Sequence, residues 1–145
     1  MEANFIGGHP MTGSEKTGIL SATNTLLENA YYIITPTALT PKEEISEFRD
    51  FVLSLGAIPL ILDYKIHDYS TAAISHLPHM IAYSLVNLVH QIDDDKETMK
   101  TIAAGGFKDI TRIASSSPVM WQNICASNRE PLLSLMDQYL SLIHI

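Results

Sequence analysis

Histidine is the residue type of this chain best suited to proton chemistry, and most of its histidines lie in one nearly uncharged segment. Between Ile66 and Ile92 the single charged side chain is Asp68, and the histidines are His67, His76, His79 and His90. A buried imidazole can act as donor, acceptor or base close to neutral pH. His76 and His79 would occupy adjacent turns of one helical face, and Pro78 between them should kink or open the helix. An apolar, broken helix that carries histidines is typical of the wall of a ligand pocket.

A metal site is a less favoured use of these histidines. His79 and His90 share a helical face but would lie roughly 16 Å apart along the axis. His76 and His79 would supply two ligands with no clear Cys or Glu companion. The acidic run Asp93-Asp94-Asp95 is typical of a solvated helix cap. We therefore expect no metal ion.

Two further segments could carry chemistry. The first, FIGGHPMTGSE from Phe5 to Glu15, places His9 among glycines that would let the backbone approach a ligand closely. We expect a loop here, and a histidine in such a loop is by itself more often structural than catalytic. The second, from Gly105 to Trp121, contains Asp109 and Arg112 three positions apart. They could form an exposed pair of little energetic value, or Arg112 could bind a carboxylate.

Composition narrows the class of protein. One cysteine in 145 residues excludes an internal disulfide and favours a cytoplasmic location. A net charge of −7 argues against non-specific nucleic-acid binding. The 66–92 segment is long enough to cross a membrane, but four histidines, Asn87, Gln91 and Pro78 suit a lipid-facing helix poorly. We expect neither a nucleic-acid partner nor a membrane span.

The chain changes character near Asp63. Before it, a β-branched run at 30–35, a helix from 41 to 55 and an apolar run at 57–62 follow the strand–helix–strand order of parallel α/β domains. Thr40 is expected to cap the helix, Glu43 to complete a capping box, and Gly56 to end it. After Asp63 only helices are predicted, at 67–91, 96–103, 109–114, 118–125 and 128–139. Asn128 is expected to cap the last of them.

The predicted 67–91 helix is apolar around its whole circumference. Such a helix is buried on every side, which in a chain this short requires a second subunit. We therefore expect a homodimer through this helix. The final residues 140–145, LSLIHI, read like a translated sequencing adapter and are suspected to be non-native.

Taken together, the three motifs resemble the prephenate dehydrogenase family. That family carries G-G-H-P-x-x-G followed by Ser/Thr-Glu, then H-D-x-x-x-x-x-x-S-H-L-P-H, then G-G-F-x-D-x-T-R-I-A with a tryptophan beyond it. All three occur here in order, and the resemblance covers about Phe5 to Tyr139. The phosphate-binding pattern Gly-x-Gly-x-x-Gly does not occur in the sequence.

The resemblance implies a mixed fold. Residues 1–63 would be the C-terminal part of a Rossmann-like NAD(P)-binding domain whose N-terminal half is missing. Residues 64–139 would be an all-α dimerisation and substrate domain. The implied reaction is oxidative decarboxylation of prephenate to 4-hydroxyphenylpyruvate in tyrosine biosynthesis, with hydride transfer to NAD or NADP.

The resemblance also implies roles for individual residues. His9 would be catalytic and would accept a hydrogen bond from the substrate hydroxyl. The implied substrate-binding residues are His79, Arg112, Ser14, Glu15, Asp109 and Trp121. Among these, Arg112 would bind a substrate carboxylate, Ser14 and Glu15 would act as loop and gate residues, and Asp109 and Trp121 would reach in from the second subunit. Ser75 and His76 would contact the substrate-binding residues without touching the substrate themselves.

Three questions stay open from sequence alone. Arogenate could replace prephenate as substrate, because no acidic residue is clearly aimed at an ammonium group. The isolated chain could be a non-catalytic helical dimerisation module, because it lacks the phosphate-binding loop. The choice between NAD and NADP cannot be read from these residues, and the cofactor-binding residues are unknown.

Overall fold

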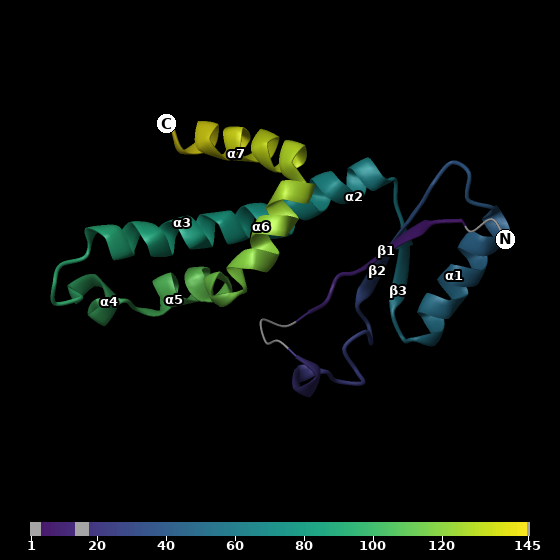
Figure 1. Cartoon of the computed structure of the whole chain (residues 1–145), viewed down its shortest axis with the longest axis horizontal. Coiled ribbons are helices and arrows are strands. Elements are labelled where there is room, and N and C mark those ends of the chain that lie inside the picture. The colour runs from purple at the N-terminus through teal and green to yellow at the C-terminus, as the bar shows by residue number, and fades with distance from the viewer. Residues whose placement is uncertain (1–3, 14–17, 145) are drawn as a thin grey trace. The chain divides into compact units, whose positions relative to one another are not determined.

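The computed structural model describes residues 4–13 and 18–144, which divide into two compact units (Figure 1). The first unit comprises Met1–Asp68 and the second Tyr69–Ile145. The first contains a small sheet, a helix and a 3-10 turn (Ile19–Ser21), and every element described in the second is a helix or a helical turn.

The sheet of the first unit has three strands in the order β1-β2-β3. These are β1 (Ile6–Pro10), β2 (Tyr31–Pro36) and β3 (Ile58–Ile61). β2 and β3 are parallel and are connected through α1 (Lys42–Ser54), so the predicted strand–helix–strand unit is confirmed. β1 is antiparallel to β2, with His9 opposite Ile33. The expectation of a glycine-rich loop around His9 is therefore wrong, because pairing with β2 makes this segment a strand.

The core of this unit lies where α1 packs on the sheet. Ile34 of β2 and Val52 of α1 are fully buried, and Ala57 joins them just before β3. Tyr32 and Phe48 pack against this cluster with their rings edge to face. The β-branched residues of β2 and the apolar stripe of α1 thus bury one another, which holds β1 and β2 in place.

Of the two predictions for the ends of α1, the one for its start is wrong and the one for its end is confirmed. Thr40 was expected as the N-cap, but its hydroxyl accepts a hydrogen bond from the Thr37 N–H at 3.0 Å within the preceding turn. Pro41 is the cap instead, its carbonyl accepting from Ile45 N–H, and no capping-box side chain bonds to it. At the other end Gly56 adopts φ +78, a left-handed conformation that glycine adopts without strain. The predicted helix end at Gly56 is confirmed.

The second unit is organised around one long helix, whose first residues, Tyr64–Asp68, belong to the first unit. The helical stretch Tyr64–Ile92 comprises α2 (Tyr64–Thr71), a π-helical turn (Ala72–His76) and α3 (Leu77–Ile92). The π turn immediately precedes α3, and Pro78 lies in the first turn of α3. A proline removes a helical N–H and crowds the preceding turn, so the predicted opening of the helix at this position is confirmed.

The remaining helices are shorter. They are α4 (Thr98–Ile102), α5 (Gly105–Thr111), a 3-10 turn (Arg112–Ser115), α6 (Pro118–Ser127) and α7 (Arg129–Ile143). α4, α5 and the 3-10 turn pack along α3 (Figure 1). α5 begins at Gly105, earlier than expected, and α7 continues beyond residue 139 to Ile143.

The long helix is covered only in part by its own chain, in keeping with the expectation that its burial requires a second subunit. In α3 the buried residue is Ala82, whereas Leu88 and Ile92 are more than half exposed. By length and composition the stretch Tyr64–Ile92 could also cross a membrane, and 11% of its apolar window is buried. The apolar surface of this helix therefore exceeds what its own chain covers.

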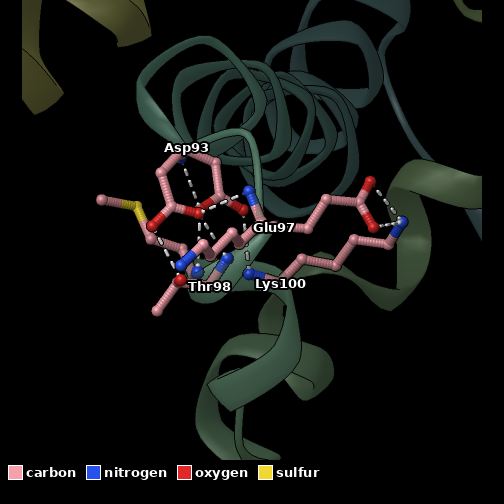
Figure 2. Close-up of polar contacts among 7 residues, drawn as sticks. Asp93, Glu97, Thr98 and Lys100 are labelled. Atoms are coloured by element: carbon pink, nitrogen blue, oxygen red, sulfur yellow. Dashed lines mark hydrogen bonds and ion pairs between the residues drawn. The ribbon is translucent and has the colours of Figure 1, made fainter.

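The start of α4 is held by the predicted acidic cap (Figure 2). Asp94 accepts hydrogen bonds from the N–H groups of Lys96 and Thr98, and Asp93 accepts from those of Met99 and Lys100, all within 2.8–3.1 Å. Backbone hydrogen bonds, from Met99 to Asp93 and from Thr98 to Asp94 above all, lower the pKa of both carboxyls. Carboxylates at a helix N-terminus satisfy N–H groups that have no partner within the helix.

Replacing Asp93 by alanine should speed amide hydrogen exchange at Met99 and Lys100, because both lose an acceptor. Asp95→Ala, in the same acidic run, is the matched control and should leave these amides unchanged. Since folding lowers the pKa of Asp93 and Asp94, the stabilisation is complete above the ordinary carboxyl pKa, about 3.9. It is lost as the pH falls through the lower folded pKa. Equal exchange in Asp93→Ala and the control would contradict this account of the cap.

Candidate active site

The first part of the candidate site is built around His9 on β1. Two glycines precede His9, and both are required by the close approach of β1 to β2. A Cβ on Gly7 would overlap Thr35 Oγ1, and a Cβ on Gly8 would lie 2.9 Å from the Tyr32 ring. The Gly-Gly-His sequence therefore lets the strand lie against β2 while the larger imidazole stays exposed at its end.

His9 belongs to a short chain of hydrogen-bonding side chains. Its Nδ1 lies 2.8 Å from Nε2 of His67, and Nδ1 of His67 lies 2.8 Å from Oδ1 of Asp68. The two imidazole rings meet edge to face at 5.1 Å between centroids. His67 is placed by the first turns of α2, whose start is capped by Asp63 accepting from the Lys65 N–H at 2.9 Å. A strand and a helix start thus bring these groups together.

The surroundings of His9 favour its neutral form. Partial burial lowers the pKa of His9 below its ordinary value of 6.5, and repulsion from His67 lowers it further. A neutral imidazole has one nitrogen with a free lone pair. His9 can therefore accept a hydrogen bond or a proton at neutral pH, as a general base requires.

The second unit holds the other predicted imidazole, His79. Its Nδ1 lies 2.9 Å from the carbonyl oxygen of Ser75 at the π turn, so it donates there and leaves Nε2 as the acceptor. The ring stacks on the indole of Trp121, with centroids 3.5 Å apart and an interplanar angle of 21°. Burial lowers the pKa of His79, although the bond to Ser75 opposes this. His79 is thus a second neutral imidazole held in one orientation.

The support behind His79 comes from α6 and α7. Trp121 is 6% exposed, and its Nε1 is buried without a hydrogen-bond partner among the described residues. His76, also buried, lies edge to face against Trp121, and its Nδ1 is 3.2 Å from the Asn128 side-chain nitrogen. Asn128 was expected to cap α7 with its side chain, but its amide is directed to His76 instead and makes no cap hydrogen bond.

Arg112 lies at the start of the 3-10 turn that follows α5. Its side chain is exposed, as is that of Asp109 in the last turn of α5. The turn is held from both sides. The Ser115 hydroxyl donates to the Arg112 carbonyl at 2.9 Å, and the Tyr83 hydroxyl of α3 donates to the Ser116 carbonyl at 2.7 Å. An exposed guanidinium on an anchored turn can bind a carboxylate with its planar edge.

The predicted site residues are thus distributed over two units. His9 belongs to the first, and His79, Arg112, Asp109 and Trp121 belong to the second. Trp121 packs against His79 of its own chain, and its contribution to a second subunit stays a prediction. Ser14 and Glu15 lie outside the described residues.

Three supporting residues were missed by the sequence analysis. His67 and Asp68 contact His9 or each other, and Asn128 contacts His76. The adjacent His-Asp pair was the available signal, since a carboxylate beside an imidazole is a frequent orienting partner.

Metal and nucleotide binding can be tested against the same residues. The described part of the chain contains no group of three or more His, Cys, Asp and Glu side chains that could hold a metal ion. The sheet has the parallel strand pair of a nucleotide-binding domain, but the sequence has no Gly-x-Gly-x-x-Gly to hold a dinucleotide phosphate. The chain by itself therefore does not provide the phosphate-binding loop.

The chain thus combines an α/β unit that carries a histidine on its sheet with a helical unit that carries a second histidine and an anchored arginine. The family models agree with this two-part organisation. The model for the prephenate dehydrogenase nucleotide-binding domain matches residues 1–60, and that for the prephenate dehydrogenase dimerization domain matches residues 63–144. The chain belongs to the prephenate dehydrogenase family. The resemblance inferred from the sequence and the predicted fold class are both confirmed.

Individual curated relatives are also similar to this chain over most of its length. The prephenate dehydrogenase of Bacillus subtilis (strain 168) is 42% identical over 136 residues, which is 94% of this chain and 37% of that protein. The cyclohexadienyl dehydrogenase of Zymomonas mobilis is 33% identical over 94% of this chain and 47% of that protein. The chain therefore spans less than half the length of these curated relatives.

Solved structures extend the comparison to the fold. Prephenate dehydrogenase from Aquifex aeolicus, in complex with hydroxyphenyl propionate and NAD+, matches with a TM-score of 0.90 and 32% identity. The match covers 96% of this chain and 49% of that one. Synechocystis arogenate dehydrogenase matches with a TM-score of 0.84 and 30% identity, over 97% of this chain and 51% of that one.

Proposed function

We propose that this chain provides the hydrogen-bond-accepting and carboxylate-binding residues of a dehydrogenase that oxidatively decarboxylates prephenate to 4-hydroxyphenylpyruvate. The observation that carries the proposal is His9, a neutral imidazole held by a hydrogen bond on a strand of a nucleotide-binding domain. The two family models and the relatives named prephenate dehydrogenase support the reaction. A cytoplasmic location, as expected from the sequence, is part of the same proposal.

His9 would act at the hydroxyl carbon of the substrate ring. As hydride leaves this carbon and carbon dioxide leaves the opposite one, positive charge develops on the hydroxyl group. A neutral imidazole that accepts a hydrogen bond from this hydroxyl stabilises the charge, and the proton remains on the phenol when the ring becomes aromatic. The hydride acceptor, NAD or NADP, would supply the redox chemistry. The finding of NAD+ in the Aquifex relative favours NAD.

The second unit would bind and orient the substrate. Arg112 would pair with one substrate carboxylate through its guanidinium edge, and His79 would present its Nε2 to a hydroxyl donor. Asp109 and Trp121 would complete the site from a second subunit, and Ser14 and Glu15 would border it. Holding a substrate in one orientation removes much of the entropic part of the barrier.

Arogenate is the second candidate substrate, because a Synechocystis arogenate dehydrogenase and a Zymomonas cyclohexadienyl dehydrogenase are both similar to this chain. Steady-state assays of a full-length dehydrogenase that contains this chain, with each substrate and each nucleotide, test the proposal. We expect turnover with prephenate by that enzyme and none by the isolated 145-residue chain. Absence of turnover with both substrates would contradict the proposed function.

We further propose that the chain forms a homodimer through the long helix, in keeping with the match to a dimerization domain. α3 and α7 border an apolar groove of about 260 Å³, lined among others by Leu77, Ile81, Leu85, Leu88, Met136 and Leu140. A second copy of the same helix would cover this surface, since obligate interfaces are as apolar as a domain core.

Leu88→Lys should convert the dimer to a monomer. Leu88 is 52% exposed within the chain, so the lysine can be accommodated without disturbing the fold. At an interface the loss of a buried leucine costs about 2 kcal/mol, roughly 30-fold in Kd, before the cost of burying a charge. Light scattering at micromolar concentration measures the mass, and Ile102→Lys on exposed α4 is the matched control. A wild-type chain with the mass of a monomer would overturn the dimer proposal. So would a wild-type chain that is recovered only bound to lipid vesicles.

A further inference from the structure

We propose that His67 and Asp68 are positioning residues that hold the His9 ring with its Nε2 lone pair free to face the substrate. The proposal rests on the proposed role of His9 as hydrogen-bond acceptor. It follows from the order in which the three side chains are joined, Asp68 to His67 and His67 to His9.

The proton positions follow from what each group can do. An ionised carboxylate can only accept, so Nδ1 of His67 must donate to Oδ1 of Asp68. When His67 is neutral, its Nε2 then has no proton and must accept. His9 must therefore donate from Nδ1 across the 2.8 Å contact, which leaves its Nε2 as the acceptor. Without His67, the His9 ring could also adopt the other tautomer, with the proton on Nε2.

The same arrangement stabilises positive charge that develops on the His9 ring. If Nε2 of His9 takes up a proton, its Nδ1–H still donates to His67, so no hydrogen bond is broken. Asp68 then stabilises the added positive charge of His9 through the hydrogen bonds that His67 makes to both residues. A carboxylate that orients an imidazole and stabilises its protonated form in this way is a recurring arrangement in acid–base catalysis.

The geometry of the fold sets this arrangement. His9 is fixed by its pairing in β1 opposite Ile33, and His67 is fixed one turn into a helix whose start is capped by Asp63. The His67 side chain is 17% exposed and that of Asp68 is 44% exposed. The His67 ring, which lies between His9 and Asp68, is therefore less accessible to water than the carboxylate. Sheltering strengthens a charge-assisted hydrogen bond relative to one in open water.

The first test is spectroscopic and does not depend on activity. Histidine-labelled 145-residue chain is measured by long-range 1H–15N correlation at a pH where the imidazoles are neutral. In the wild type we expect the His9 signals of the Nδ1–H tautomer. In His67→Leu, which removes the acceptor, we expect a shift toward the Nε2–H form. His90→Leu, the same substitution later in the long helix, is the control for the fold. An unchanged His9 tautomer in His67→Leu would overturn the inference.

The second test separates this inference from the proposed function. In a full-length dehydrogenase that contains the chain, His67→Leu should lower kcat about 10- to 100-fold, part of the 10²–10⁴ that a positioned acid–base group provides. KM should change little. His67→Gln, whose carbonyl can accept from His9, should recover part of the loss. Full kcat in His67→Leu, with low kcat in His9→Asn, would overturn the positioning role and leave the proposed function standing. Full kcat in both variants would overturn the proposed function.

Discussion

Replacing His9 by asparagine is expected to lower kcat by about 10²- to 10⁴-fold in a full-length dehydrogenase that contains this chain. Asparagine can still donate from its amide to His67, so the contact made by Nδ1 is kept. It has no counterpart of Nε2, so the hydrogen bond to the substrate hydroxyl is lost. His9 is exposed at the end of β1, and its replacement should leave the sheet intact.

Steady-state kinetics with prephenate measure this effect, and His90→Asn serves as the control because His90 is an exposed histidine in the last turn of α3. The control should keep near wild-type kcat. If His9→Asn turned over at close to the wild-type rate, His9 would be a strand residue with no catalytic part.

The second large effect is expected at Arg112. A carboxylate held by a guanidinium is bound in both the ground state and the transition state, so its loss raises KM with little change in kcat. Arg112→Ala should cost on the order of 2–4 kcal/mol, roughly 30- to 1,000-fold in KM, if the contact is bidentate and shielded from water. Arg112→Lys should restore part of the affinity, because an ammonium group cannot reproduce the planar fork.

The alternative for Arg112 is an exposed helical pair with Asp109, which predicts less than about 1 kcal/mol and no dependence on substrate. Arg129→Ala, at the exposed first residue of α7, is the matched control and should leave KM unchanged. An unchanged KM in both Arg112 variants would remove Arg112 from the site.

Much of the fold could be predicted because its signals are local. The β-branched run of β2, the apolar stripe of α1 and the glycine at position 56 each specify their own element. The break in the long helix also follows locally from Pro78. β1 could not be predicted in this way, because glycine and proline have low strand propensity and the strand exists only through pairing with β2. Thr40 failed as a cap because the turn at Thr37 competes for its hydroxyl.

The candidate site shows the same limit. His9, His79 and Arg112 were predicted from motifs. The partner of His9 could not be predicted, because His67 lies 58 positions away and only the meeting of β1 with α2 brings the rings together. Likewise, the sequence placed Asn128 at a helix start but gave no sign that its amide would be directed to His76, 52 positions away. Contacts between distant segments depend on the tertiary fold, which motif spacing does not encode.

The pH dependence of kcat/KM tests most directly whether a neutral His9 is the acceptor. Partial burial of the ring and the nearby His67 lower the pKa of His9 below 6.5, and the reaction needs the neutral ring. In the full-length enzyme, activity should therefore hold through neutral pH and fall only as the pH drops through this lowered pKa, since kcat/KM reports groups of the free enzyme. In His9→Asn the residual activity should show no such decline. A decline of the same midpoint and depth in His9→Asn would show that another group titrates and would contradict the account.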